Sequence, residues 1–316
     1  MVTFEDVQSA HSRIRQHIIP TPVMTSTTID AMSGSSVHFK CENFQRVGAF
    51  KFRGALNAVS MLSEEEKARG VVTHSSGNHA QALSLAAKLL GVKATIVMPN
   101  NSPRVKVEAT RGYGAEIVFC ESTVNSRVET ATRLVKENGY TLVHPYNDER
   151  IIAGAGTAAL ELMQEASPLK AVFAPVGGGG LLSGTSIAVK GYSEDTHVIG
   201  CEPENADDAY RSLRDGKIYP SVNPDTIADG LRTNLGDITF GIIRQNVDKI
   251  VTVSESEIVR AMRLLWERMK LVVEPSGAVS LAGMLKTANE LQGARTGVII
   301  SGGNVDLDKF FEQYSR

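Results

Sequence analysis

The stretch VVTHSSGNHAQALSLAAKLL, from Val71 to Leu90, contains a complete strand–turn–helix unit. The β-branched run Val71-Val72-Thr73 predicts a strand, Ser75-Ser76-Gly77-Asn78-His79 predicts a turn, and Ala80 to Leu90 predicts a helix. A second apolar run, Ala94 to Met98, predicts the next strand. Strands that alternate with helices in this way are typical of a parallel sheet joined by crossover helices.

The same alternation extends in both directions from this stretch. Toward the N-terminus we expect a helix, a strand and a second helix, at 4–18, 37–41 and 51–62. Toward the C-terminus we expect helices at 103–111, 128–137, 151–164, 181–190 and 255–269, a helix opened by 274–277, and strands at 116–119, 141–143, 171–174, 197–200, 250–253 and 297–300. The predicted fold class is α/β, with a small domain at 70–147 and a large domain formed by 1–69 and 148–316.

The composition argues against several classes of function. The formal net charge of −2 is not the electrostatic footprint of a nucleic-acid-binding protein. No apolar run approaches the roughly 20 residues of a membrane span, and Met1 to Asp6 lacks the basic and apolar segments of a signal peptide. Cys41, Cys120 and Cys201 are far apart, which favours neither a disulfide framework nor a zinc site. We expect a cytoplasmic protein without nucleic-acid or membrane partners.

A lysine between two aromatic rings is the first candidate for chemistry. It lies in the heptad Gly48-Ala49-Phe50-Lys51-Phe52-Arg53-Gly54. Burial against apolar rings disfavours the ammonium form and lowers the amine pKa. A neutral amine can hold an aldehyde cofactor as a Schiff base. Taken alone, Lys51 is better explained as an ordinary exposed lysine in the first turn of an amphipathic helix, and only the rest of the chain favours the chemical role.

Three predicted strands end in small polar or glycine-rich turns, at Ser75 to His79, Gly177 to Gly180 and Ser301 to Asn304. Ligands of open α/β sheets bind at the carboxyl ends of the strands, so these turns are expected to line one crevice. Glycine turns that open helices expose backbone N–H groups to anions such as phosphate. Lys51 together with a phosphate site indicates pyridoxal phosphate as the cofactor.

The four successive glycines also allow one alternative from another class. They lack the Gly-Lys-Ser/Thr ending of a Walker loop, and a dinucleotide fingerprint would need a glycine at Leu182 or Ser183. Glu202 nevertheless stands about where a ribose-binding acid should be. A nucleotide-binding oxidoreductase therefore stays open as an alternative, as does a catalytically idle binding module.

The chain resembles the fold type II pyridoxal-phosphate enzymes, in particular the serine racemases and the short serine/threonine dehydratases. The resemblance rests on Lys40 to Gln45, Gly48 to Ala55, Ser75 to Gln81, Gly177 to Gly180 and Ser301 to Asp306, which agree with the family in order and spacing. These segments span nearly the whole chain. The resemblance implies a fold like that of the tryptophan synthase β subunit, with two open, twisted, mainly parallel sheets and flanking helices.

The resemblance also implies roles for individual residues. Lys51 and Ser76 are implied to be catalytic, because they exchange the α-proton on opposite faces of the substrate. The implied cofactor contacts are Phe50, Lys51, Asn78, Gly177, Gly178, Gly179, Gly180, Gly230, Glu274 and Ser301. The implied substrate contacts are Ser75, Ser76, Asn78, His79, Arg127, Tyr146 and Thr233.

A divalent cation site is implied by the run Glu202-Pro203-Glu204-Asn205-Ala206-Asp207-Asp208. In the matching racemase pattern, the carboxylates of Glu202 and Asp208 and the carbonyl of Ala206 bind the cation. Such oxygen ligands suit Mg²⁺, Ca²⁺ or Mn²⁺. The alternative is an acidic helix start, which is favourable without any metal.

The implied function is that of a serine racemase and L-serine (L-threonine) dehydratase. Such an enzyme eliminates water from a β-hydroxy amino acid, yields an oxo acid and ammonia, and racemises serine. A 3-hydroxyaspartate dehydratase and a catabolic threonine dehydratase are the alternatives within the family. We expect a small amino-acid substrate and a homodimer. Nucleotide activation is not predicted, since Arg46-Val47 departs from the Lys-Thr pair of the animal racemases.

Overall fold

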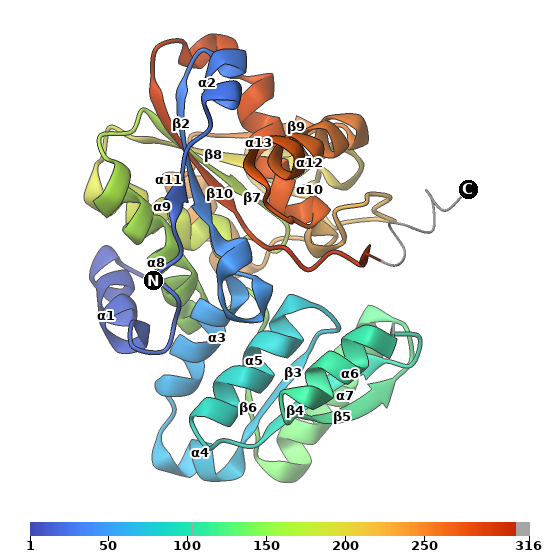
Figure 1. Cartoon of the computed structure of the whole chain (residues 1–316). Helices are drawn as coiled ribbons and strands as arrows, with labels where there is room; N and C mark the ends of the chain where they lie inside the picture. Colours follow the sequence, from blue (N-terminus) through green and yellow to red (C-terminus); the bar gives the residue numbers. More distant parts are fainter. Residues whose placement is uncertain (103, 308–316) are drawn as a thin grey trace.

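The computed structural model describes residues 1–102 and 104–307, which form two sheets with helices packed around them (Figure 1). The larger sheet has six strands in the order β1-β2-β10-β7-β8-β9, and the smaller has four in the order β5-β4-β3-β6. The β1–β2 pair is antiparallel, and the other pairs of both sheets are parallel. The predicted α/β class with two mainly parallel sheets is confirmed.

The larger sheet is buried on both faces. Its strands are β1 (Val23–Met24), β2 (Ser36–Cys41), β7 (Ala171–Pro175), β8 (His197–Pro203), β9 (Lys249–Val253) and β10 (Arg295–Ile300). Along β7, Val172 and Ala174 join a core with α8 (Glu149–Ala166) and α9 (Gly180–Tyr192). The alternate residues, Ala171 and Phe173, join a second core with α12 (Glu255–Met269) and α13 (Pro275–Lys286). Helices on both faces explain why β7 is apolar and buried along its whole length.

The smaller sheet lies below the larger one in Figure 1 and is formed by the middle of the chain. Its strands are β3 (Val71–His74), β4 (Ala94–Pro99), β5 (Glu116–Cys120) and β6 (Thr141–Leu142), and its helices are α5 (Asn78–Leu89), α6 (Arg104–Gly112) and α7 (Val124–Asn138). Val72 and Val97 pack with residues of α7, whereas Val71 and Ile96 pack with residues of α5 and α3. All of these strands fall within 70–147, whose independence as a domain stays a prediction.

The remaining elements connect or cover these layers. They are the helices α1 (Phe4–Ile14), α2 (Thr27–Ser33), α3 (Lys51–Ser60), α4 (Glu64–Arg69), α10 (Asp208–Asp215) and α11 (Asp237–Asn246), and the 3₁₀ turns η1 (Glu42–Phe44), η2 (Arg46–Gly48), η3 (Glu204–Ala206), η4 (Asp229–Leu231) and η5 (Ala288–Leu291). Within the described residues, no helix is both long and apolar enough to cross a membrane.

Several boundaries differ from the sequence-based expectation because caps decide where helices begin and end. The first helix stops at Ile14 rather than at residue 18. Helix α7 begins at Val124, four residues before the expected start, because the Thr123 side chain accepts a hydrogen bond from Ser126 N–H at its first turn. Pro103, expected to open the next helix, lies outside the described residues.

Candidate active site

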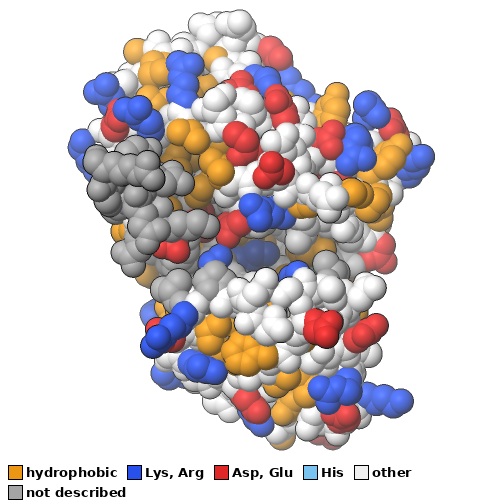
Figure 2. Space-filling model, turned by 90° about the vertical axis from the view of Figure 1, so that its right-hand side faces the viewer, with side chains coloured by type: hydrophobic (Ala, Val, Ile, Leu, Met, Phe, Trp, Pro, Cys, Tyr) orange, Lys and Arg blue, Asp and Glu red, His pale blue; other side chains and the backbone are white. Residues whose placement is uncertain are grey.

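A cavity of about 370 Å³ lies among the loops at the carboxyl ends of the strands. Figure 2 shows a hollow between the two parts of the molecule, with Lys and Arg side chains in it. Every residue implied to contact the cofactor or the substrate lines this cavity, namely Phe50, Lys51, Ser75, Ser76, Asn78, His79, Arg127, Tyr146, Gly177, Gly178, Gly179, Gly180, Gly230, Thr233, Glu274 and Ser301. The implied metal ligands are not among its lining residues.

Lys51 is the first residue of α3 and faces the cavity. Its Nζ donates a hydrogen bond to the Pro145 carbonyl at 2.8 Å and lies 5.1 Å from the centre of the Phe50 ring. Burial lowers the pKa of this amine from 10.5 to about 8. A larger fraction of the amine is therefore neutral near neutral pH than for an exposed lysine. This is the environment that a lysine needs to bind an aldehyde.

The glycine turn brings backbone into the cavity where side chains would not fit. It runs from β7 into α9, whose first residue is Gly180. A Cβ on Gly178 would lie 2.4 Å from the Tyr146 ring, and one on Gly177 would lie 2.8 Å from the Leu231 Cα. Gly179 has a φ of +89°, a backbone conformation that residues other than glycine rarely adopt. The start of α9 is therefore shaped for an anion such as the cofactor phosphate.

The amide of Asn78 is oriented by two partners from distant parts of the chain. Its Nδ2 donates to Glu274 Oε1 at 2.8 Å, and its Oδ1 accepts from Asn304 Nδ2 at 2.9 Å. Asn304 Nδ2 also donates to the Val47 carbonyl at 2.7 Å. Because the Val47 carbonyl can only accept, the amide atom of Asn304 beside it is the nitrogen, and the atom of Asn78 that faces this nitrogen is the oxygen. One N–H of Asn78 is left for the cavity, as a hydrogen bond to a cofactor hydroxyl requires.

Two residues that hydrogen-bond to Asn78 or Asn304, namely Val47 and Glu274, are in states that cost free energy on folding. Val47 has a φ of +55°, which is unusual for a β-branched residue. Burial raises the pKa of the Glu274 carboxyl to about 7, although the hydrogen bond from Asn78 acts to lower it. Local strain and a perturbed carboxyl are more common at functional sites than elsewhere.

The turn before α5 and the first residues of α5 carry four of the seven predicted substrate residues. Ser75, Ser76, Asn78 and His79 all lie where β3 ends and α5 begins. His79 is buried, its Nε2 lies 3.3 Å from the Val143 carbonyl, and its Nδ1 has no partner among the described residues. Burial, followed by the Lys51 charge, holds the pKa of His79 well below its usual value. The imidazole is therefore neutral, and the helix start is suited to a substrate carboxylate.

Arg127 places a positive charge beside the predicted substrate residues. It lies on α7 and lines the cavity, and its Nε donates to the Thr123 carbonyl at 3.4 Å rather than to a carboxylate. Lys106, which also lines the cavity, instead pairs with Asp229 at 2.9 Å. The Arg127 charge, after burial, lowers the pKa of His74. This side of the cavity is therefore suited to an acidic substrate group.

Other lining residues were not assigned to the site from the sequence, among them His74, Lys106, Pro145, Asp229 and Asn304. Four of them carried a signal, because each adjoins or ends a segment with a predicted contact: His74 precedes the Ser75 turn, Pro145 precedes Tyr146, Asp229 precedes Gly230, and Asn304 ends the 301–304 turn. Lys106 carried none, since only folding brings its segment to Asp229.

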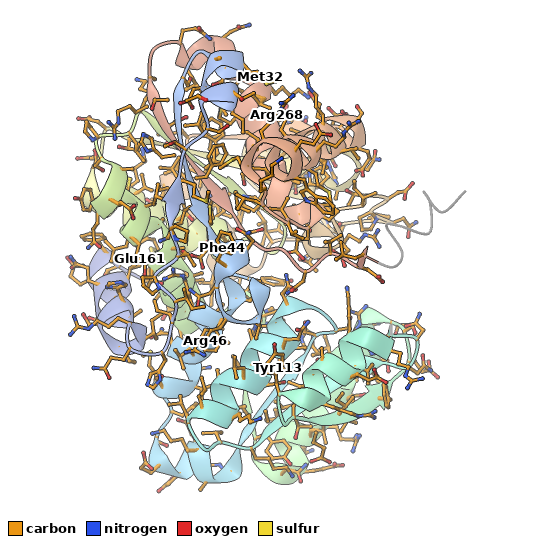
Figure 3. All side chains as sticks on the ribbon, viewed as in Figure 1. Met32, Phe44, Arg46, Tyr113, Glu161 and Arg268 are labelled. Carbon is orange, nitrogen blue, oxygen red and sulfur yellow. The ribbon has the colours of Figure 1, made fainter. Side chains whose placement is uncertain are left out.

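A buried ion network supports the helix that begins with Lys51. The Arg53 guanidinium is fully buried and donates to Glu42 at 2.7 and 2.8 Å and to Glu161 on α8 at 2.7 and 2.8 Å. Lys40 Nζ pairs with Glu161 at 2.6 Å and donates to the Thr21 carbonyl at 2.6 Å. Glu161 is labelled in Figure 3. The network joins β2, α3 and α8, and so fixes the position of Lys51 relative to the larger sheet.

The implied metal ligands form a separate buried cluster. Glu202 is at the end of β8, and its two oxygens accept from the N–H groups of Ala209 and Tyr210 at 2.9 and 2.8 Å. Both oxygens of Asp208 are buried without a partner among the described residues. Burial raises the pKa of Asp208 to about 6, and burial and Asp208 together raise that of Glu202 well above its usual value.

Two adjacent buried carboxylates fit a cation chemically. The acidic helix start that was the alternative is present too, because Glu202 caps α10. Among the described residues, no group of three or more His, Cys, Asp or Glu side chains is placed to hold a metal ion. The cation site with the Ala206 carbonyl therefore stays a prediction.

Comparison with known proteins extends these observations. Residues 14–302 match the family model described as pyridoxal-phosphate dependent enzyme. The chain is 49% identical over 307 residues to the beta-hydroxyaspartate dehydratase of Paracoccus denitrificans, covering 97% of this chain and 98% of that protein. It is 50% identical over 309 residues to the L-threo-3-hydroxyaspartate ammonia-lyase of Saccharomyces cerevisiae, covering 98% and 95%.

A solved structure agrees with these matches. The crystal structure of serine racemase from Dictyostelium discoideum superposes with a TM-score of 0.93 at 48% identity, covering 96% of this chain and 99% of that one. These findings support a fold type II enzyme and not the nucleotide-binding oxidoreductase considered as an alternative. The chain belongs to the family of pyridoxal-phosphate-dependent enzymes.

Proposed function

We propose that this protein is a pyridoxal-phosphate-dependent dehydratase of β-hydroxy amino acids that also racemises serine. The observation that carries the proposal is the presence of Lys51, Ser76 and the glycine turn around one cavity. The names of the relatives, which include both hydroxyaspartate ammonia-lyases and serine racemases, point in the same direction. The overall reaction converts serine to pyruvate and ammonia, or 3-hydroxyaspartate to oxaloacetate and ammonia.

The chain offers one group for each part of the cofactor. Lys51 would bind its aldehyde, the start of α9 its phosphate, and Asn78 its ring hydroxyl. Phe50 would lie against the ring and Ser301 would face the pyridine nitrogen, with Gly230 and Glu274 bordering it. Bound pyridoxal phosphate would supply an electron acceptor that stabilises negative charge at the substrate α-carbon.

The remaining groups would bind the substrate and move its protons. Ser75, Asn78 and His79 at the start of α5 would bind the substrate carboxylate. Lys51 Nζ would take the proton from the α-carbon of the L-substrate, and Ser76 Oγ would exchange it from the other side. Such transfers require each group within hydrogen-bond reach of the carbon-bound proton. Tyr146, Thr233 and Arg127 would surround the substrate side chain.

Replacing Ser76 with alanine is expected to separate the two activities. Without its hydroxyl the inversion of serine should fall by roughly 100-fold or more, the usual contribution of a positioned acid or base. Dehydration of L-serine should change far less, because Lys51 still takes the α-proton. Chiral chromatography and an oxo-acid assay measure the two rates. Racemisation at the original rate would contradict the two-base arrangement.

The preferred substrate is tested by a panel of L-serine, D-serine, L-threonine and the 3-hydroxyaspartate stereoisomers. Arg127 favours a dicarboxylate, so 3-hydroxyaspartate dehydratase is the second candidate function. In Arg127→Met, kcat/KM for 3-hydroxyaspartate should fall roughly 10- to 100-fold, the effect of losing a charged hydrogen bond, and that for serine should fall less. Arg133→Met, an exposed arginine on the same helix, is the control. An equal loss of kcat/KM for 3-hydroxyaspartate and for serine would refute a role of Arg127 in recognising the substrate side chain.

We propose that Glu202, Asp208 and the Ala206 carbonyl bind Mg²⁺ or a similar cation, since burying two carboxylates together is otherwise costly. Chelation should lower the Tm of the enzyme, and added Mg²⁺ should restore it. Asp208→Asn should abolish this response, whereas Asp215→Asn, on the exposed end of the same helix, should keep it. A Tm that is insensitive to chelator and to Mg²⁺ would rule the site out.

We also propose that the enzyme is a cytoplasmic homodimer. Met32 and Phe44, both labelled in Figure 3, are apolar side chains that are 44% and 45% exposed in the single chain. Light scattering during size-exclusion chromatography measures the mass, and cell fractionation tests the location.

A further inference from the structure

The turn between β6 and α8 is built around the side chain of His144. Its Nδ1 accepts hydrogen bonds from the backbone N–H groups of Asn147 at 2.9 Å and Tyr146 at 3.3 Å. The ring packs edge-on against His74, with centroids 5.6 Å apart, and against Tyr146 at 4.6 Å. One imidazole nitrogen thus takes the place of the carbonyl acceptor that usually closes a tight turn.

This arrangement requires a neutral imidazole with its hydrogen on Nε2, because Nδ1 can accept only when unprotonated. Burial is the main cause that lowers the pKa of His144 to about 4, and the charges of His74 and Lys51 add to it. Asp148 and Asp237 act in the opposite direction without outweighing them. The acceptor therefore persists throughout the neutral pH range.

The turn held by His144 directs one backbone carbonyl at the proposed catalytic lysine. Pro145 lies between His144 and the two N–H donors, and its carbonyl accepts from Lys51 Nζ at 2.8 Å. The two residues are 94 positions apart in the chain. Proline at this position supplies no N–H and fixes its own φ, so the carbonyl is the polar group that the turn presents.

We propose that the Pro145 carbonyl holds the free Lys51 amine, and that His144 is the positioning residue that keeps this carbonyl in place. The inference rests on the proposed function, in which Lys51 is free whenever it acts as a base. A neutral amine has two N–H groups and one lone pair. Donation of one N–H to Pro145 restricts rotation of Nζ and leaves the lone pair available to accept a proton or to attack an aldehyde.

The test compares His144→Asn with His144→Leu. The Oδ1 of asparagine can accept from the same backbone N–H groups, as in an Asx turn, whereas leucine accepts nothing. In the holoenzyme, the amides of Tyr146 and Asn147 should be protected from hydrogen exchange in wild type and His144→Asn but exchange rapidly in His144→Leu. The kcat of His144→Leu should fall roughly tenfold or more with little change in KM, because the misplaced group is the base.

A second readout does not depend on turnover. After cofactor is removed from the full chain and pyridoxal phosphate is added back, the rate of visible band formation reports attack by Lys51. This rate should fall roughly tenfold in His144→Leu and stay near the wild-type rate in His144→Asn. Circular dichroism confirms that each variant is folded.

Two results would overturn the proposal. One is protected amides and an unchanged rate of cofactor binding in His144→Leu. The other is a folded His144→Asn that is as defective as His144→Leu, because the imidazole would then act by something other than acceptance at Nδ1. If the proposed reaction itself is wrong, the substrates of the panel are not turned over. The rate of cofactor binding in the His144 variants still reports whether Lys51 is correctly positioned.

Discussion

Replacing Lys51 with alanine is expected to abolish both dehydration and racemisation. The variant loses the group that would bind the cofactor aldehyde and the base that would take the α-proton, so kcat should fall by roughly 1000-fold or more. The purified variant should also lack the yellow colour of the holoenzyme. Absorption spectra and the substrate panel measure the two effects. In wild type, borohydride should fix the cofactor to the peptide that contains Lys51.

The control is Lys88→Ala, which removes an exposed lysine at the end of α5 and should leave colour and activity intact. The pH dependence of Lys51 is a further check. In the cofactor-stripped chain, its reaction with an amine-specific reagent should increase through a midpoint near pH 8, because burial lowers its pKa from 10.5 to about 8. Exposed lysines should react at higher pH. A yellow, active Lys51→Ala would refute the assignment.

Replacing Arg53 with methionine is expected to destabilise the protein by about 3–5 kcal/mol, the cost of leaving a buried charge without its partner. Glu42 is fully buried and would lose both hydrogen bonds from the guanidinium. Urea unfolding measures the free energy of unfolding. Arg133→Met, which breaks an exposed pair with Glu137, should change it by less than about 1 kcal/mol. Similar losses in the two variants would contradict the importance of the buried network.

Acid should weaken the same network. Burial alone would raise the pKa of Glu161, but hydrogen bonds from His11 and Arg53 and the charges of Arg53 and Lys40 hold it well below the ordinary value of 4.5. A carboxyl whose folded pKa is depressed contributes stability above its unfolded pKa and loses that contribution as the pH falls. The loss should therefore begin as the pH drops through about 4.5 and should be smaller in Arg53→Met.

Elements with strong local patterns could be predicted from the sequence, and elements set by their surroundings could not. The β3–α5 unit and the glycine turn into α9 formed as expected, since apolar runs, turn residues and helical periodicity are local properties. The helices α10 and α11 and the two-residue strand β1 were not predicted. These elements are short or follow Pro- and Gly-containing segments, so their local sequence preference is weak. Their formation depends instead on contacts with the sheet and with Glu202.

The sequence by itself determined the α/β class and the identity of the candidate residues around Lys51. It could not determine which atoms they meet, because Lys51 reaches Pro145, Asn78 reaches Glu274, and Arg53 reaches Glu161 across 94, 196 and 108 positions. Only the tertiary structure removed water from Lys51 and presented a carbonyl to its amine. The energy of an ion pair and the pKa of an amine depend on burial and on neighbours in space. The order of residues along the chain does not specify that burial or those neighbours.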